Sequence, residues 1–114
     1  GCAAANASLD LLEDNPEKYK NFKSRHLFHL KSLAKNPKVI KPRVYGTIAA
    51  FNIDIDSPKG YLNSIGKELK KYALREGVFL RPLGDVVYLL PPLCISDTEL
   101  EKCYSTINKG LEEI

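Results

Sequence analysis

Apolar residues recur along this chain at two spacings, one typical of helices and one typical of strands. Residues 1–14 are dominated by alanine and leucine, and no proline interrupts them, which predicts a helix. A second helix is predicted from Asn15, an N-cap residue followed by a proline, to about Asn36, after which Pro37 ends it. Its apolar stripe has the 3.6-residue period, and its members are Tyr19, Phe22, His26, Leu30 and Leu33.

The middle of the chain predicts one strand and one helix. The strand covers about 43–53, where β-branched and aromatic residues give two fairly apolar faces. Ser57 and Pro58 then signal the start of a third helix, which Gly77 ends. This helix has a narrow apolar stripe, formed by Tyr61, Leu62, Ile65, Leu69 and Tyr72.

The last third predicts a hairpin followed by a helix. Strands at 78–81 and 86–90 flank the turn sequence PLGD, and two prolines end the second strand. The sequence SDTE at 96–99 is a capping box that begins the last helix. The order helix, helix, strand, helix, strand, strand, helix favours an α+β fold, in which a small antiparallel or mixed three-stranded sheet carries helices mainly on one face.

Composition indicates one domain and a cytoplasmic location. The chain has 114 residues, of which 44% are hydrophobic, enough for one modest core. We find no apolar run near the roughly 20 residues of a membrane helix, and no signal peptide. Three cysteines without a CxxC pair suggest neither a disulfide framework nor a zinc ribbon.

Positive charge is concentrated in one part of the chain. Residues 18–43 contain nine of the 17 basic residues and no acidic residue. A nucleic-acid site would need these charges on one face with aromatic side chains between them, whereas here they spread over the solvent side of the second helix. We therefore favour the interpretation that these charges lie on a solvent-exposed helix face over the interpretation that they bind nucleic acid. The alternative function is therefore a stand-alone binding or interaction module, possibly one that binds nucleic acid through helix 16–36.

Few residues have the spacing of catalytic or metal-binding groups. His26 and His29 lie three apart on a helix, but no third ligand accompanies them, and packing roles are favoured. Asp54 and Asp56 are best explained as a polar loop before a helix, and Cys103 as part of a core stripe. The sequence contains no glycine-rich phosphate loop, and it predicts no catalytic or metal-binding residue.

Arg81 is a cation among apolar residues. One explanation is an ion pair with Asp85 across the turn. Strand alternation, however, places Arg81 on the same side as Phe79, in a hairpin whose two faces are both apolar. A hairpin with two apolar faces must be covered on both of them. Four helices are predicted, and the first of them looks truncated, so one face of the hairpin would remain uncovered.

Three stretches resemble one known family. The block GVFLRPLGDVVYLLPPLCISDTEL is similar to the carboxyl-terminal signature of the class III pyridoxal-phosphate aminotransferases, and GCAAANASLDLLE and RVYGTIAAFNID resemble two further segments of that family. The resemblance spans the whole chain. It implies the small carboxyl-terminal domain of a fold type I enzyme, with residues 1–36 as helices that lead into an α+β domain at 37–114. The large domain that binds pyridoxal phosphate would lie outside this chain.

The same resemblance implies a function. Within the family, the arginine-to-proline-proline block is most similar to the biotin-biosynthesis members, which implies amino transfer from S-adenosylmethionine, or lysine as in some relatives, to 7-keto-8-aminopelargonic acid. Arg81 matches the arginine that binds the substrate carboxylate, and Tyr88 matches an active-site tyrosine. No lysine here matches the Schiff-base motif, so pyridoxal phosphate is expected on the parent enzyme, a homodimer, and not on these residues alone. We therefore expect the 114 residues by themselves to be inactive.

Overall fold

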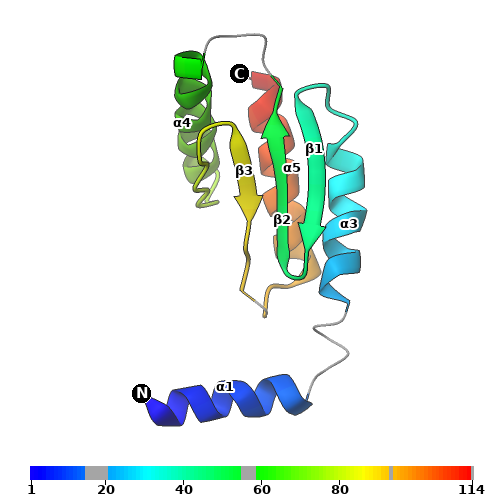
Figure 1. Cartoon of the computed structure of the whole chain (residues 1–114), viewed down its shortest axis with the longest axis vertical. Helices are drawn as coiled ribbons and strands as arrows, with labels where there is room; N and C mark the ends of the chain where they lie inside the picture. Colours follow the sequence, from blue (N-terminus) through cyan, green and yellow to red (C-terminus); the bar gives the residue numbers. More distant parts are fainter. Residues whose placement is uncertain (15–20, 55–58, 93, 114) are drawn as a thin grey trace.

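The computed structural model describes residues 1–14, 21–54, 59–92 and 94–113, and the side chains of 59–64 are not described. Its elements are α1 (Cys2–Asp14), α3 (Phe22–Leu33), β1 (Val39–Tyr45), β2 (Ile48–Ile53), α4 (Lys59–Arg75), β3 (Val86–Leu89) and α5 (Asp97–Glu113). The three strands form one antiparallel sheet in the order β1-β2-β3 (Figure 1). The predicted α+β class is confirmed.

The prediction of one strand over 43–53 is wrong, because this segment contains a chain reversal. β1 and β2 are the two arms of a hairpin, in which Tyr45 pairs with Ile48 across Gly46 and Thr47. Gly46 has a φ of 61°, a conformation that glycine adopts without steric cost. Both arms are rich in β-branched residues, so composition did not mark the turn between them.

The prediction of a strand at 78–81 is also wrong. This segment alternates like a strand but joins no ladder, and one isolated bridge between Leu83 and Val86 is all that pairs the two arms of the predicted hairpin. Pro82 has no N–H to donate to such a ladder. β3 instead pairs with β2, where Ala50 lies opposite Tyr88 and Asn52 opposite Val86.

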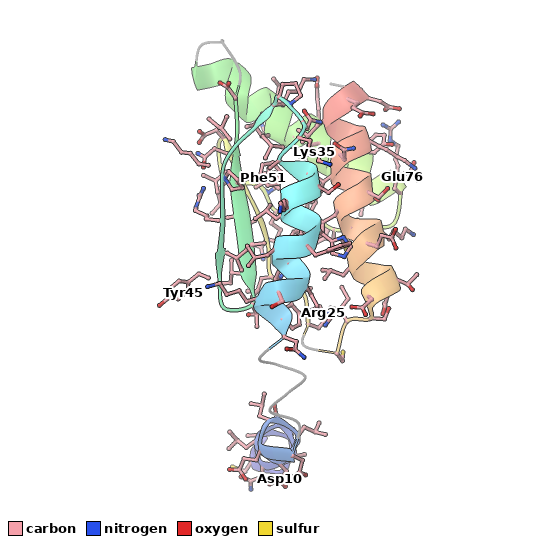
Figure 2. The ribbon with its side chains drawn as sticks, turned by 90° about the vertical axis from the view of Figure 1, so that its right-hand side faces the viewer. Asp10, Arg25, Lys35, Tyr45, Phe51 and Glu76 are labelled. Atoms are coloured by element: carbon pink, nitrogen blue, oxygen red, sulfur yellow. The ribbon has the colours of Figure 1, made fainter. Side chains whose placement is uncertain are left out.

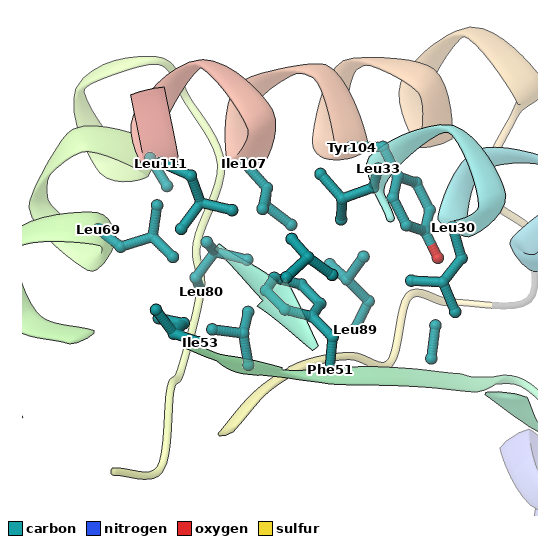
Figure 3. Packing of buried hydrophobic residues seen from close by; sticks show 14 of the residues in the cluster. Leu30, Leu33, Phe51, Ile53, Leu69, Leu80, Leu89, Tyr104, Ile107 and Leu111 are labelled. Carbon is teal, nitrogen blue, oxygen red and sulfur yellow. The ribbon is translucent and has the colours of Figure 1, made fainter. Parts of the chain in front are cut away.

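Helices α3, α4 and α5 cover one face of the sheet, and Figure 2 shows that face from the side. The core lies between the two layers, where Phe51 of β2, Leu69 of α4 and Ile107 of α5 are at most 1% exposed (Figure 3). The other side of the sheet, here called the open face, carries the side chains that alternate with the buried ones. These are Ile40, Arg43, Tyr45, Ile48, Ala50, Asn52, Val86 and Tyr88.

The predicted end of α4 and the predicted start of α5 are correct, whereas α3 ends at Leu33, before the predicted end at about Asn36. Gly77, with a φ of 85°, ends α4 in a Schellman motif, in which the N–H of Val78 donates to the carbonyl of Ala73 at 2.8 Å. The capping box of α5 is present, since Ser96 and Glu99 exchange two hydrogen bonds of 3.1 Å. The predicted helix starts at 15–16 and 57–58 lie outside the described residues.

Helix α1 stands apart from the two-layer body (Figure 1). None of its residues is buried, and Leu9 and Leu11 are 56% and 59% exposed. An isolated helix of 13 residues is marginal in water, so α1 requires a surface to pack against. None of the described helices is both long and apolar enough to cross a membrane.

Candidate functional site

Arg81 lies in an extended segment that runs along the edge of the body. Val78 and Leu80 are buried, at 8% and 2% exposure, whereas Phe79 and Arg81 are exposed. The alternation that placed Arg81 on the side of Phe79 is therefore confirmed. Lys70 of α4 lies with its Nζ 5.5 Å from the centroid of the Phe79 ring, which adds a second cation on this side of the segment.

The turn after Arg81 is held from three directions. Leu83 and Val86 exchange two backbone hydrogen bonds of 2.9 Å, and Gly84 between them has a φ of 61°. The N–H of Ile53 on β2 donates to the carbonyl of Asp85 at 2.8 Å. On the other side, a Cβ at Gly66 of α4 would lie 3.2 Å from the Gly84 carbonyl oxygen, so α4 approaches the turn closely because residue 66 is glycine.

The guanidinium of Arg81 makes no hydrogen bond or ion pair with the side chains that the structure describes. The ion pair with Asp85, considered as an alternative, does not form. The carboxylate of Asp85 instead accepts a hydrogen bond from Asn52 Nδ2 at 3.0 Å. The Oδ1 of the same amide accepts one from Arg43 Nη1 at 2.8 Å. The Asp85 carboxylate therefore does not occupy the donors of Arg81.

Tyr88 lies on the open face of β3, half-buried, between the buried Val87 and Leu89. Its register partner on β2 is Ala50, whose small side chain leaves room above the sheet. Tyr88 thus lies on the side of the sheet that the helices leave uncovered, and Arg81 lies in the exposed segment that precedes the turn before β3. Tyr45 is an exposed side chain at the end of β1, and Phe79, Leu83 and Leu90 are exposed apolar side chains close to Arg81 or Tyr88 in the sequence.

His26 is a structural residue that joins three elements. Its ring is fully buried; Nε2 lies 2.8 Å from the carbonyl oxygen of Thr47, and Nδ1 lies 2.6 Å from the Tyr104 hydroxyl. A carbonyl can only accept, so Nε2 carries the proton and Nδ1 accepts from Tyr104. Burial lowers the pKa of His26, and both ring nitrogens are engaged. His29 stacks on Tyr104 with the ring centroids 5.1 Å apart.

The other residues singled out in the sequence do not form a site within the described part of the chain. Asp54 is exposed, and Asp56 lies outside the described residues. Cys103 packs against the core, and burial raises the pKa of its thiol. Among the described residues no three His, Cys, Asp or Glu side chains are close enough to hold a metal ion.

The basic helix does not present a uniform cationic face. Arg25 of α3 is bonded to Asp97 through Nε at 2.7 Å and to the carbonyl of Ile95 at 2.8 Å. The groove between α3 and α5, of about 1180 Å³, is lined by Lys31 and Lys35 but also by Glu101. This mixture of signs does not favour a nucleic-acid surface.

Asn52, Arg43 and Asp85 form a polar chain on the open face that sequence reasoning missed. The signal for it is a single amide within an otherwise apolar strand, since a polar side chain in such a strand needs a partner. The sequence does not predict which residue is that partner, because Asn52 and Asp85 are 33 residues apart.

The described residues do not form a site for pyridoxal phosphate. A Schiff-base lysine lies in an enclosed pocket, whereas the lysine side chains described here are exposed, apart from half-buried Lys38, whose Nζ donates to the Leu111 carbonyl.

The sequence pattern of the family Aminotransferase class-III matches residues 1–111. The chain belongs to the class III aminotransferases. The adenosylmethionine-8-amino-7-oxononanoate aminotransferase of Synechococcus elongatus is 46% identical over 114 residues, and that of Geobacter sulfurreducens is 33% identical over 124. All of this chain is covered in both alignments, but it spans only 27% and 26% of these relatives.

Solved structures of aminotransferases have the same fold. The adenosylmethionine-8-amino-7-oxononanoate aminotransferase of Methanocaldococcus jannaschii matches 98% of this chain with a TM-score of 0.85 and 25% identity, and the chain covers 27% of it. The ω-transferase of Vibrio fluvialis matches the same share with a TM-score of 0.84 at 24% identity. The two-layer arrangement of this class III aminotransferase chain is therefore that of fold type I transaminases.

Proposed function

We propose that this chain is the carboxyl-terminal part of a biotin-biosynthesis aminotransferase, in which Arg81 binds the carboxylate of the keto acid substrate. The enzyme would convert 7-keto-8-aminopelargonic acid to 7,8-diaminopelargonic acid, with S-adenosylmethionine as the amino donor. The names of the similar relatives support this reaction. The observation that carries the role of Arg81 is that its guanidinium is exposed and has no partner among the described side chains, beside a turn fixed on three sides.

A guanidinium suits this role because it is always charged and donates two parallel hydrogen bonds to a carboxylate. The surroundings favour the same role. Lys70 adds positive charge beside Phe79, and Tyr88 offers a hydroxyl on the strand that follows the turn. Tyr88 would then contact substrate or cofactor at the same site.

The rest of the enzyme would supply the cofactor site. Pyridoxal phosphate, when bound there, supplies the electron sink that amino transfer needs. We propose that residues 1–36 lead into the small domain, that 37–114 form it, and that the exposed apolar side chains of α1 and of the open face pack against the large domain. The complete enzyme would be a cytoplasmic homodimer, and the 114 residues alone would be inactive.

The test uses the complete enzyme, prepared either from its own gene or as a chimaera in which these 114 residues replace the matching segment of the Synechococcus elongatus relative. Arg81→Ala is expected to raise KM for the keto acid about 10- to 100-fold, the loss of one or two charge-assisted hydrogen bonds. The half-reaction with the amino donor should change far less. Arg81→Lys should recover part of the lost substrate affinity, since a lysine keeps the positive charge but cannot donate two parallel hydrogen bonds to one carboxylate.

Arg75→Ala is the matched control, because Arg75 is an exposed arginine at the end of α4 that lies over the Tyr72 ring. It should leave both half-reactions unchanged. Equal impairment of the two half-reactions by Arg81→Ala would refute a dedicated carboxylate role. Absence of any amino transfer to 7-keto-8-aminopelargonic acid would refute the proposed reaction.

A further inference from the structure

Asp85 is the natural competitor of a substrate for Arg81. It follows Arg81 by four residues, across a tight turn closed by the two hydrogen bonds between Leu83 and Val86. An arginine and a carboxylate at that separation can form a surface ion pair where their side chains meet. Such a pair would occupy the same guanidinium donors that a substrate carboxylate needs.

The structure holds the Asp85 carboxylate elsewhere. Asn52 of β2 donates from Nδ2 to Asp85 Oδ2 at 3.0 Å, and the backbone of the neighbouring Ile53 donates to the Asp85 carbonyl at 2.8 Å. Asp85 is thus tied to β2 through both its side chain and its backbone. These bonds draw the carboxylate toward the middle strand of the sheet.

The orientation of the Asn52 amide is fixed by the chemistry of its two partners. Its Oδ1 faces Arg43 Nη1 at 2.8 Å, a group that can only donate, and its Nδ2 faces a carboxylate that can only accept. Arg43 is held in turn, because the same Nη1 lies 2.8 Å from the carbonyl of Lys41. That carbonyl belongs to a bulge of β1 in which Lys41 has a φ of 51°. A chain of polar contacts therefore runs from the edge strand to the turn.

We propose that Asn52 is a positioning residue, which holds the Asp85 carboxylate on the open face and so keeps Arg81 unpaired for a carboxylate substrate. This inference rests on the proposed role of Arg81. Asn52 itself touches no reacting atom. It acts by holding the Asp85 carboxylate away from Arg81. The same arrangement allows an acidic residue next to the site without the loss of substrate affinity that an internal ion pair would cause.

Two substitutions of Asn52 test this in the complete enzyme. Asn52→Ala removes the amide and frees Asp85. Asn52→Asp keeps the shape and the bond to Arg43 but places a second carboxylate beside Asp85, which repels it. Each is expected to raise KM for the keto acid about 3- to 5-fold, because an exposed ion pair between Asp85 and Arg81 would compete with the substrate. The kcat should stay within about 2-fold of the starting value.

The decisive variant is Asp85→Asn, which removes the competing charge. Alone it should leave KM unchanged, and combined with either Asn52 substitution it should restore KM to the starting value. Asn108→Ala is the matched control, since the Asn108 amide accepts a hydrogen bond from Asn36 at 3.1 Å in another part of the fold. It should change neither KM nor kcat.

The outcomes separate this inference from the proposed function. If Arg81→Ala raises KM but both Asn52 variants behave like Asn108→Ala, Asn52 does not position the site. If the Asn52 variants raise KM and Asp85→Asn does not restore it, their effect is on the sheet and the inference is likewise overturned. If Arg81→Ala leaves KM unchanged, the proposed role of Arg81 fails, and the positioning role fails with it.

Discussion

The hydrogen bond between Tyr104 and His26 is expected to be a measurable part of the stability of the fold. Tyr104→Phe removes the hydroxyl that donates to His26 Nδ1 and leaves the ring in place, so no cavity is created. Both side chains are buried, with 4% and 0% exposure, and water cannot replace the lost donor. The buried acceptor then lacks a partner, which costs about 1–3 kcal/mol.

Urea unfolding of the 114-residue chain at low protein concentration measures this cost. With a slope of about 1–3 kcal/mol per M for a small protein, a loss of 2 kcal/mol lowers the midpoint by roughly 1 M. Tyr45→Phe is the control, because the Tyr45 side chain is 88% exposed and its hydroxyl remains in water. It should shift stability by less than about 0.5 kcal/mol. Equal midpoints for the two variants would show that the buried bond contributes nothing.

The same histidine should make stability depend on pH. Burial lowers the pKa of His26 below its ordinary value of 6.5, so the unfolded chain binds a proton more readily than the folded one. The stabilisation is therefore complete well above the ordinary pKa, and it is lost as the pH falls through 6.5 toward the lowered pKa of the folded state. His26→Asn keeps a polar side chain that does not titrate, and its stability should be flatter across this range. Parallel curves for the two proteins would refute the assignment.

Three further results are expected. Ser96→Ala should lower stability by about 1 kcal/mol in thermal unfolding, and it should raise the pKa of Glu99, whose bonds to Ser96 hold it below 4.5. A Cβ at Gly110 would lie 2.7 Å from Leu69 Cδ1, so Gly110→Ala should destabilise the α4–α5 contact by about 1–2 kcal/mol in urea unfolding despite the better helix propensity. The isolated chain should self-associate in sedimentation experiments, and Phe79→Ser, at a 65% exposed position, should reduce this; a well-behaved monomer at high concentration would contradict it.

The helices were predictable from the sequence because their signals are local. The stripe of α5, with Leu100, Tyr104, Ile107 and Leu111, is buried as the 3.6-residue period predicts, and its capping box lies within four residues. The strands were less predictable. The β1–β2 turn at Gly46 lies within a run of β-branched residues whose two faces are both apolar, so alternation does not reveal where the chain reverses.

The candidate site shows the same division between local and long-range information. Alternation with the buried Leu80 was enough to place Arg81 on the exposed side. The anion nearest in sequence, Asp85, was the natural candidate for its partner, and only strand pairing excludes it. Because β3 pairs with β2, Asn52 comes to lie beside Asp85 and engages its carboxylate. A ladder between residues 78–81 and β3 would use the edge of β3 that faces away from β2. The contact between Asn52 and Asp85 would therefore be the same with or without that ladder. The state of Arg81 therefore depends on the order of the strands, which no local pattern in the sequence specifies.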